Sequence, residues 1–211
     1  MTIVYPVSLP PDLLGVTITI TDGNLAAVVT SEFTGQVQVQ QWPGQFWGAR
    51  MTWSRRERAV MAQLESRLRS LEGPVGTILL HDTTLAAPRG SAAGAPVVDG
   101  VDQSGRTLNT RGWTPSAPGV LLENDRFSIG SGAGTRLHCV LGDVDADGAG
   151  RATLDIWPRL REAPADGEPL VTTAAKGLFF MTSDLAVQRS DRNLTTISAS
   201  FRERLPLDAF G

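Results

Sequence analysis

The sequence predicts a mainly β protein with a single α-helix. Most of its 211 residues fall in short stretches where apolar and polar side chains alternate, and turn residues separate these stretches. Only residues 54–71 carry apolar side chains at helical spacing. Because 41% of the residues are hydrophobic, the chain can bury the core of one large β domain or of two small ones.

The N-terminal part predicts a small antiparallel sheet. "VTITI" at 16–20 and "QVQVQ" at 36–40 alternate cleanly, with β-branched residues on one face. "LAAVVT" at 25–30 predicts a further strand, and "TDGN" before it is a turn signal. Three strands are therefore expected within the first 40 residues.

A helix is expected in "SRRERAVMAQLESRLRSLEGP". Ser54 and Glu57 match the S-x-x-E pattern of a capping box, which satisfies free backbone N–H groups where a helix begins. The Gly-Pro pair at 73–74 predicts the end of this helix, after about 17 residues. One apolar face would cover a sheet; it contains Val60, Met61, Leu64, Leu68 and Leu71. A strand is expected next, in "VGTILLHD" at 75–82.

The second half of the chain predicts many short strands. Residues 86–120 are rich in Gly, Ala, Pro and Ser, so irregular loops with short strands are expected there. Closely spaced strands follow in "GVLL", "RFSIG", "TRLHCVL", "RATLDIW" and "GLFFMT", a pattern typical of a barrel or sandwich. The last strand is expected at 194–203, with Thr195, Ile197, Ala199 and Phe201 on one side.

The stretch "GDVDADGAG" resembles a calcium-binding EF-hand loop, because Asp143, Asp145 and Asp147 alternate before a glycine. The twelfth position of such a loop must be a bidentate Glu, and here it is Leu154. Strand-like segments flank the loop, whereas an EF-hand needs helices. We therefore predict the tip of a β-hairpin and no metal site, with a weak surface cation site as the alternative.

Composition and motifs argue against several function classes. A net charge of −3 is unlike the basic footprint of nucleic-acid-binding proteins. The sequence contains no targeting segment and no run of about 20 apolar residues, so no membrane contact is expected. His81 and His138 each lie between apolar strand residues, and Cys139 excludes an internal disulfide. We therefore expect neither catalytic residues nor a cofactor.

The segment "QWPGQFWGARMTW" carries four large aromatic residues within twelve positions. Core packing is expected for Trp53 and for one of the others. A Pro-Gly turn cannot bury all four rings in a small domain, and exposed aromatic residues mark partner surfaces. Trp42, Phe46, Trp47 and Arg50 are therefore the candidate partner-interface residues.

Two long segments carry a family resemblance. "FTGQVQVQQWPGQFWGARMTW", followed by the helix and "GTILLHD", resembles the N-terminal part of the distal tail proteins of siphophages and gene-transfer-agent-like particles. "LLENDRFSIGSGAGTRLHCVLGDVDADGAGRATLDIWP" resembles the small β-barrel module of the same proteins, with Asn124-Asp125 where Gly-Asp is usual. These motifs are structural and identify no active site.

The resemblance implies a fold, a set of partners and a location. Residues 1–85 together with 180–211 would form a ring-forming β-sandwich, the belt domain. Residues 86–179 would form an inserted small β-barrel, similar to an OB-fold. The implied assembly is a hexameric ring in the virion tail, made in the host bacterial cytoplasm. It would join the tail tube to the tail-tip hub or baseplate, near the tape-measure protein.

Two functions remain open from the sequence. In the first, the chain is a structural ring around the DNA channel, without sequence-specific contact to nucleic acid. In the second, it is a carbohydrate-binding β module for attachment to the host surface, because exposed tryptophans also bind sugars. The first leads to a closed oligomer, whereas the second leads to a monomer that binds polysaccharide.

Overall fold

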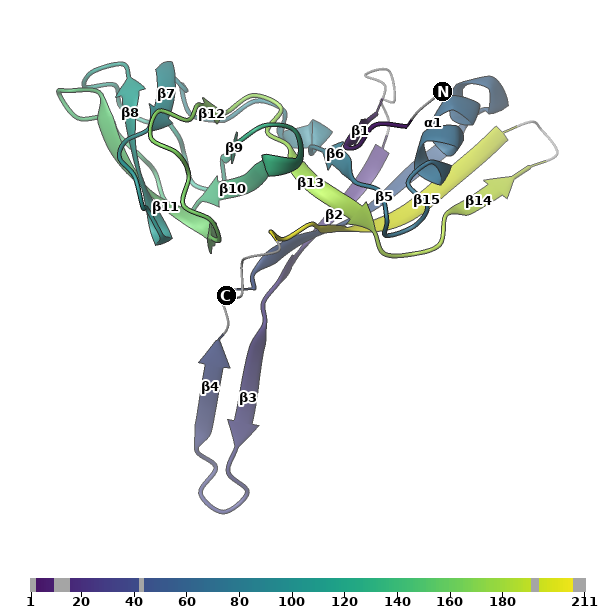
Figure 1. Cartoon of the computed structure of the whole chain (residues 1–211), viewed down its shortest axis with the longest axis horizontal. Helices are drawn as coiled ribbons and strands as arrows, with labels where there is room; N and C mark the ends of the chain where they lie inside the picture. The colour runs from purple at the N-terminus through teal and green to yellow at the C-terminus, as the bar shows by residue number, and fades with distance from the viewer. Residues whose placement is uncertain (1–2, 10–15, 42–43, 191–193, 207–211) are drawn as a thin grey trace.

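The computed structural model describes residues 3–9, 16–41, 44–190 and 194–206, and it shows a mainly β protein with one α-helix (Figure 1). Its strands form a seven-stranded sheet, a nearly closed six-stranded sheet that resembles a barrel, and a two-stranded ribbon. This architecture confirms the predicted fold class of a β-sandwich with one helix and a small barrel.

The seven-stranded sheet, here called the belt sheet, is centred on β15 (Leu194–Glu203) and β5 (Phe46–Glu57), which pair antiparallel along most of their lengths. The side chains of β15 alternate as predicted, with Thr195, Ile197, Ala199 and Phe201 all buried. The other strands are β1 (Val7–Ser8), β6 (Ile78–Leu80), β13 (Gly177–Met181), β14 (Ala186–Arg189) and β2 (Val16–Gly23).

The helix α1 (Arg58–Arg69) covers one face of the belt sheet (Figure 1). Met61, Leu64 and Leu68 are buried within the helix, as is Leu71 just after it, so the predicted apolar face is confirmed for these four residues. Val60 is exposed instead. Strands β5 and β15 and the helix α1 share one hydrophobic cluster, which includes the fully buried Trp53.

The predicted start of the helix is wrong. Residues 54–57 belong to β5, and the N-cap residue Glu57 makes no side-chain capping hydrogen bond. Pairing with β15 explains the difference, because Glu57 lies opposite Leu194 and Arg56 opposite Thr195. These ladder hydrogen bonds with a distant strand outweigh the local capping pattern, so the helix has 12 residues.

The six-stranded sheet, here called the barrel sheet, encloses a second hydrophobic cluster that includes Leu108, Phe127, Leu154 and Ile156. A bridge between Val97 and the segment before β12 nearly closes the sheet. In spatial order its strands are β12 (Leu170–Val171), β9 (Arg126–Ile129), β10 (Arg136–Val140), β11 (Arg151–Leu160), β8 (Gly105–Trp113) and β7 (Gly94–Val98).

All six barrel strands lie in sequence between β6 and β13 of the belt sheet. The segments between β6 and β7 and before β10 contain the short helices η1 (Thr83–Leu85) and η2 (Gly132–Gly134). Strand β13 crosses position 179, where the inserted segment is expected to end, and pairs with belt strands on both sides. The region 86–120 is more regular than expected, because β8 alone has nine residues.

Candidate functional site

The four candidate interface residues do not share one environment. Arg50 is exposed on β5, and Phe46 is half-buried on the same strand, with the guanidinium of Arg202 3.7 Å from its ring centroid. Trp47 is only 6% exposed, so its ring is not available to a partner. Trp42 lies outside the described residues. Phe46 and Arg50 therefore remain as surface residues, and Trp53 is fully buried as expected.

Trp47 joins the belt sheet to the barrel sheet. Its indole Nε1 donates a hydrogen bond to the carbonyl oxygen of Leu137 at 3.0 Å. Its ring packs edge-on against Trp157 of β11, with centroids 4.3 Å apart. The guanidinium of Arg126 lies 5.3 Å from the ring centroid. Trp47 thus contacts residues of three barrel strands, β9, β10 and β11, which sequence spacing alone does not indicate.

Two buried ion pairs strengthen the same junction. Arg161, the residue directly after β11, and Glu203 of β15 form two hydrogen bonds of 2.9 and 2.7 Å, with side chains only 2% and 0% exposed. Arg126 of β9 pairs with Asp82 beside η1 at 3.1 Å. The Arg161–Glu203 pair links the end of β11 to the belt sheet, and the Arg126–Asp82 pair links β9 to the segment that follows β6 of the belt sheet. The two sheets are therefore held in one orientation.

The two-stranded ribbon projects from the molecule as a separate arm (Figure 1). It consists of β3 (Ala26–Thr30) and β4 (Val37–Gln41), which pair antiparallel with Val28 opposite Val39 and Thr30 opposite Val37. Paired residues share a face, so one face of the arm is apolar. On this face Val28 and Val39 are 62% and 63% exposed, and Phe33 at the tip is 98% exposed.

The arm and the adjoining edge of the belt sheet lack the usual protection against pairing. Within residues 24–41 the only charged side chain is Glu32, and there is no proline. Strand β2 is the last strand on its side of the belt sheet, and residues 16–21 are only Val, Thr and Ile. Charged residues or prolines normally block such edges. The sequence predicted these strands correctly, but the small sheet expected from all three is wrong, because β2 pairs with β5 while β3 and β4 form a separate ribbon.

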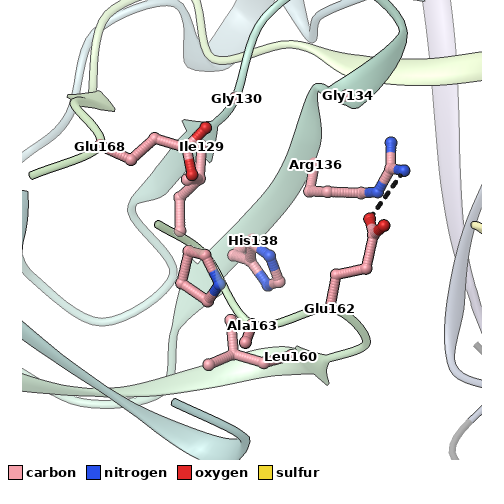
Figure 2. Close-up of a pocket in the computed structure, with 10 residues that line it drawn as sticks. Ile129, Gly130, Gly134, Arg136, His138, Leu160, Glu162, Ala163 and Glu168 are labelled. Carbon is pink, nitrogen blue, oxygen red and sulfur yellow. Dashed lines mark hydrogen bonds and ion pairs between the residues drawn. The ribbon is translucent and has the colours of Figure 1, made fainter. Parts of the chain in front are cut away.

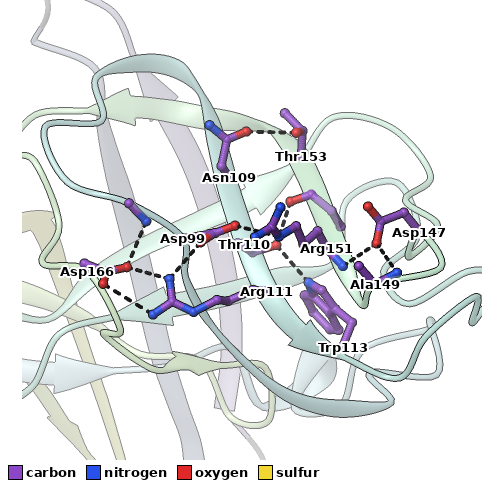
Figure 3. Close-up of polar contacts among 12 residues, drawn as sticks. Asp99, Asn109, Thr110, Arg111, Trp113, Asp147, Ala149, Arg151, Thr153 and Asp166 are labelled. Atoms are coloured by element: carbon purple, nitrogen blue, oxygen red, sulfur yellow. Dashed lines mark hydrogen bonds and ion pairs between the residues drawn. The ribbon is translucent and has the colours of Figure 1, made fainter.

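The Asp-rich loop uses its carboxylates to hold backbone N–H groups. Asp143 accepts from Glu123, and Asp145 accepts from Gly119. Asp147 accepts from the N–H groups of Ala149 and Arg151, and these hydrogen bonds lower its pKa (Figure 3). The loop connects the paired strands β10 and β11, as predicted, but it is broad and packs against the segment at 117–123.

A further network lies on the outside of the barrel. Arg111 of β8 binds the carboxylates of Asp99 and Asp166 at 2.8 and 2.6 Å (Figure 3). The Arg111 guanidinium and then the Gly100 N–H lower the pKa of Asp166 to about 2. The network links β8 to the loops that contain Asp99 and Asp166, and these two carboxylates neutralise the charge of Arg111.

A pocket of about 310 Å³ opens at one end of the barrel, between β9, β10 and the segment after β11 (Figure 2). Arg136 and Glu162 form an ion pair at its rim. Beneath them His138 is buried, and its Nδ1 lies 2.8 Å from the carbonyl oxygen of Pro158. Burial lowers the pKa of His138 to about 3, so its ring is neutral at physiological pH.

The histidines do not lie in an arrangement typical of catalysis. His81 and His138 belong to different parts of the fold, and burial also lowers the pKa of His81. The thiol of Cys139 is buried. Within the described ranges, no group of three or more His, Cys, Asp or Glu side chains could hold a metal ion. No helix in that part of the chain is long and apolar enough to cross a membrane.

Comparison with known proteins returned neither a matching family model nor a matching curated protein.

Proposed function

We propose that this chain is a structural component of a phage tail: the distal tail protein, which forms a closed ring between tail tube and tail-tip hub. The number of subunits implied by the resemblance is six, and the DNA channel would pass through the ring. The observation that carries the proposal is the projecting arm, with its uncharged edges and its exposed apolar face.

The arm cannot gain much stability by itself. A lone two-stranded ribbon is at best marginally stable in water, because it buries little apolar surface and leaves both edges unpaired. Val28, Val37 and Val39 lie on one face and are all exposed. Contact with a second copy would bury this face and pair at least one of the two edges. A ribbon of this kind is therefore expected to complete its structure within an assembly.

A ring also needs two different surfaces on each copy, so that one copy binds the next and the rotation closes. The open edge of β2 and the arm that follows it supply a long surface on one side of the belt sheet. On the other side, the short strands β1 and β14 end the sheet. Edge pairing between successive copies would extend the belt sheet around the ring without any change in its fold.

The carbohydrate-binding alternative has less support. A sugar platform needs aromatic rings that face solvent, whereas Trp47 is buried and the guanidinium of Arg202 covers Phe46. The barrel pocket is lined mainly by charged and aliphatic side chains and by the buried His138, and its lining includes no Trp, Tyr or Phe ring to stack on a sugar. The ring-forming function is therefore the one that we propose.

Negative-stain microscopy of the purified full-length chain, together with its molar mass by light scattering, tests the proposal. We expect closed rings with a central channel and a mass about six times the 22.5 kDa of one copy. The neighbouring tail-tube protein is added if the chain alone does not assemble. A chain that stays monomeric under both conditions, or binds polysaccharide as a monomer, contradicts the proposal.

A further inference from the structure

The face of the belt sheet opposite α1, here called the outer face, is a flat surface of hydroxyl groups and arginines. The register places Thr19, Arg50 and Ser200 side by side on β2, β5 and β15. Two residues further along the same face, Arg202 of β15 lies beside Gly48 of β5. The alternate residues of these strands, such as Ile18, Met51 and Ala199, point into the core, so the outer face is the solvent-facing side.

Three arginines give this face a positive charge. Arg50 and Arg202 lie on it, and Arg204 follows β15 with its guanidinium 5.7 Å from the ring of Phe180. Among the described residues, no carboxylate forms an ion pair with any of the three, whereas seven of the other arginines are paired. The chain as a whole has a net charge of −3, so this local charge is opposite in sign.

Two of these arginines lie over phenylalanine rings, which leaves the N–H donors of their guanidinium groups available to a ligand. A guanidinium that stacks on an aromatic ring is attracted by its face and still presents its N–H groups at the edge. The guanidinium of Arg202 lies 3.7 Å from the centroid of Phe46, and that of Arg204 lies over Phe180 at the longer distance of 5.7 Å. Both donor groups are therefore held at the surface without a protein anion to neutralise them.

We propose that the outer face binds the phosphate backbone of double-stranded DNA without regard to sequence. Arginine and the hydroxyls of serine and threonine are common donors to phosphate oxygens. The described residues of this face belong to strands of the belt sheet, and α1 covers the opposite face, so no helix lies here to enter a groove and read base edges. The inference rests on the proposed function: in a ring whose DNA channel is lined by this face, several copies would contact one duplex.

The test measures binding of a short labelled duplex to the full-length chain by fluorescence anisotropy, over a range of salt concentrations and for two unrelated sequences. Each phosphate contact contributes about −0.9 to the slope of log K against log salt. We expect equal affinities for both sequences. The variant Arg50→Ser, Arg202→Ser, Arg204→Ser should bind at least about tenfold more weakly at low salt, with a slope smaller by about 2–3 for each bound copy.

The matched control is Arg58→Ser, Arg69→Ser, Arg106→Ser, which removes the same charge from exposed positions away from the outer face. This control should keep most of the affinity and of the slope. Equal losses in both variants, or no binding by the wild type at low salt, overturn the proposal. Arg50→Ser alone is measured as well, so that a folding defect in the triple variant does not decide the result.

Light scattering on the same samples separates this inference from the proposed function. Rings that form but do not bind DNA overturn the inference alone. A monomer that binds DNA through these arginines overturns the proposed ring instead. If the triple variant fails to assemble while the wild type assembles without DNA binding, the outer face is a protein interface and the inference is wrong.

Discussion

Arg161 and Glu203 form a doubly hydrogen-bonded ion pair that is almost completely buried between the barrel and the belt sheet. The remaining Nε–H of Arg161 donates to the carbonyl oxygen of Gln45, and Glu203 also accepts from the backbone N–H of Trp47. Each nitrogen of the guanidinium and each oxygen of the carboxylate thus makes at least one hydrogen bond where the two sheets meet. This junction fixes how the barrel is placed on the ring that we propose.

Removing one partner of this pair should be costly. Glu203→Ala leaves the Arg161 guanidinium buried without its anion, and breaking such a pair typically costs about 3–5 kcal/mol in the free energy of unfolding. The control is Glu162→Ala, because the Glu162 side chain is 52% exposed, so water screens its pair with Arg136 and the pair should contribute about 0–1 kcal/mol. Denaturant titration measures the free energy of unfolding of both variants. A similar loss of this free energy in the two variants would show that burial of the ion pair does not matter.

The helix should stabilise the belt mainly through its buried leucines. Leu64 and Leu68 are both 0% exposed, and Leu→Ala at such positions costs about 2–5 kcal/mol. Val60→Ala on the exposed side should change the free energy of unfolding by less than about 0.5 kcal/mol. Ser54→Ala should be equally mild, since Ser54 lies in β5 and caps no helix. A leucine variant as stable as the Val60 variant would contradict the observed packing.

Alternation was the most reliable signal in the sequence. The strand at 194–203 was predicted with its correct limits and with its correct division into two faces, because a period of two directly reports alternation across a sheet. The helix start was predicted wrongly, because the capping pattern of Ser54 and Glu57 is local while the pairing of β5 with β15 is not. Hydrogen-bonded pairing between strands that are far apart in the chain cannot be predicted from the residues near one of them.

The junction and the arm could not be predicted from the sequence for a related reason. Arg161 and Glu203 are 42 residues apart, and spacing does not reveal which charges meet across such a distance. Aromatic content predicted a special role for the segment around Trp47 but not whether its ring lies inside or outside. The arm was predicted as strands, yet only the structure shows that β3 and β4 pair with each other alone.

The Asp-rich loop should need its carboxylates but no calcium. Asp145→Ala removes the acceptor for the Gly119 N–H, so the midpoint of unfolding should fall, whereas Asp145→Asn keeps an acceptor oxygen and should lose less. Addition of calcium or of EDTA should leave the melting temperature of the wild type unchanged. Calorimetry that detects tight calcium binding, abolished when Asp143, Asp145 and Asp147 are all Asn, would contradict this account.

The stability should depend on pH through His138. Burial lowers its folded-state pKa to about 3, below the ordinary value of 6.5. Between these two values the unfolded chain binds the proton more tightly, so the free energy of unfolding should fall as the pH falls from about 6.5 towards about 3. His138→Gln should make this dependence shallower. Denaturant titration across that pH range checks this prediction. If the free energy of unfolding changes equally with pH in wild type and variant, His138 is excluded as the cause.

The central claim is that the apolar face of the arm assembles the ring, and one matched pair of variants tests it most directly. Val28→Glu with Val39→Glu places two charges on the apolar face, whereas Gln38→Glu with Gln40→Glu places the same charges on the opposite face. The decisive measurement is molar mass by light scattering. We expect rings for the wild type and the Gln variant and 22.5 kDa monomers for the Val variant. A Val variant that forms rings as well as the wild type would contradict the account.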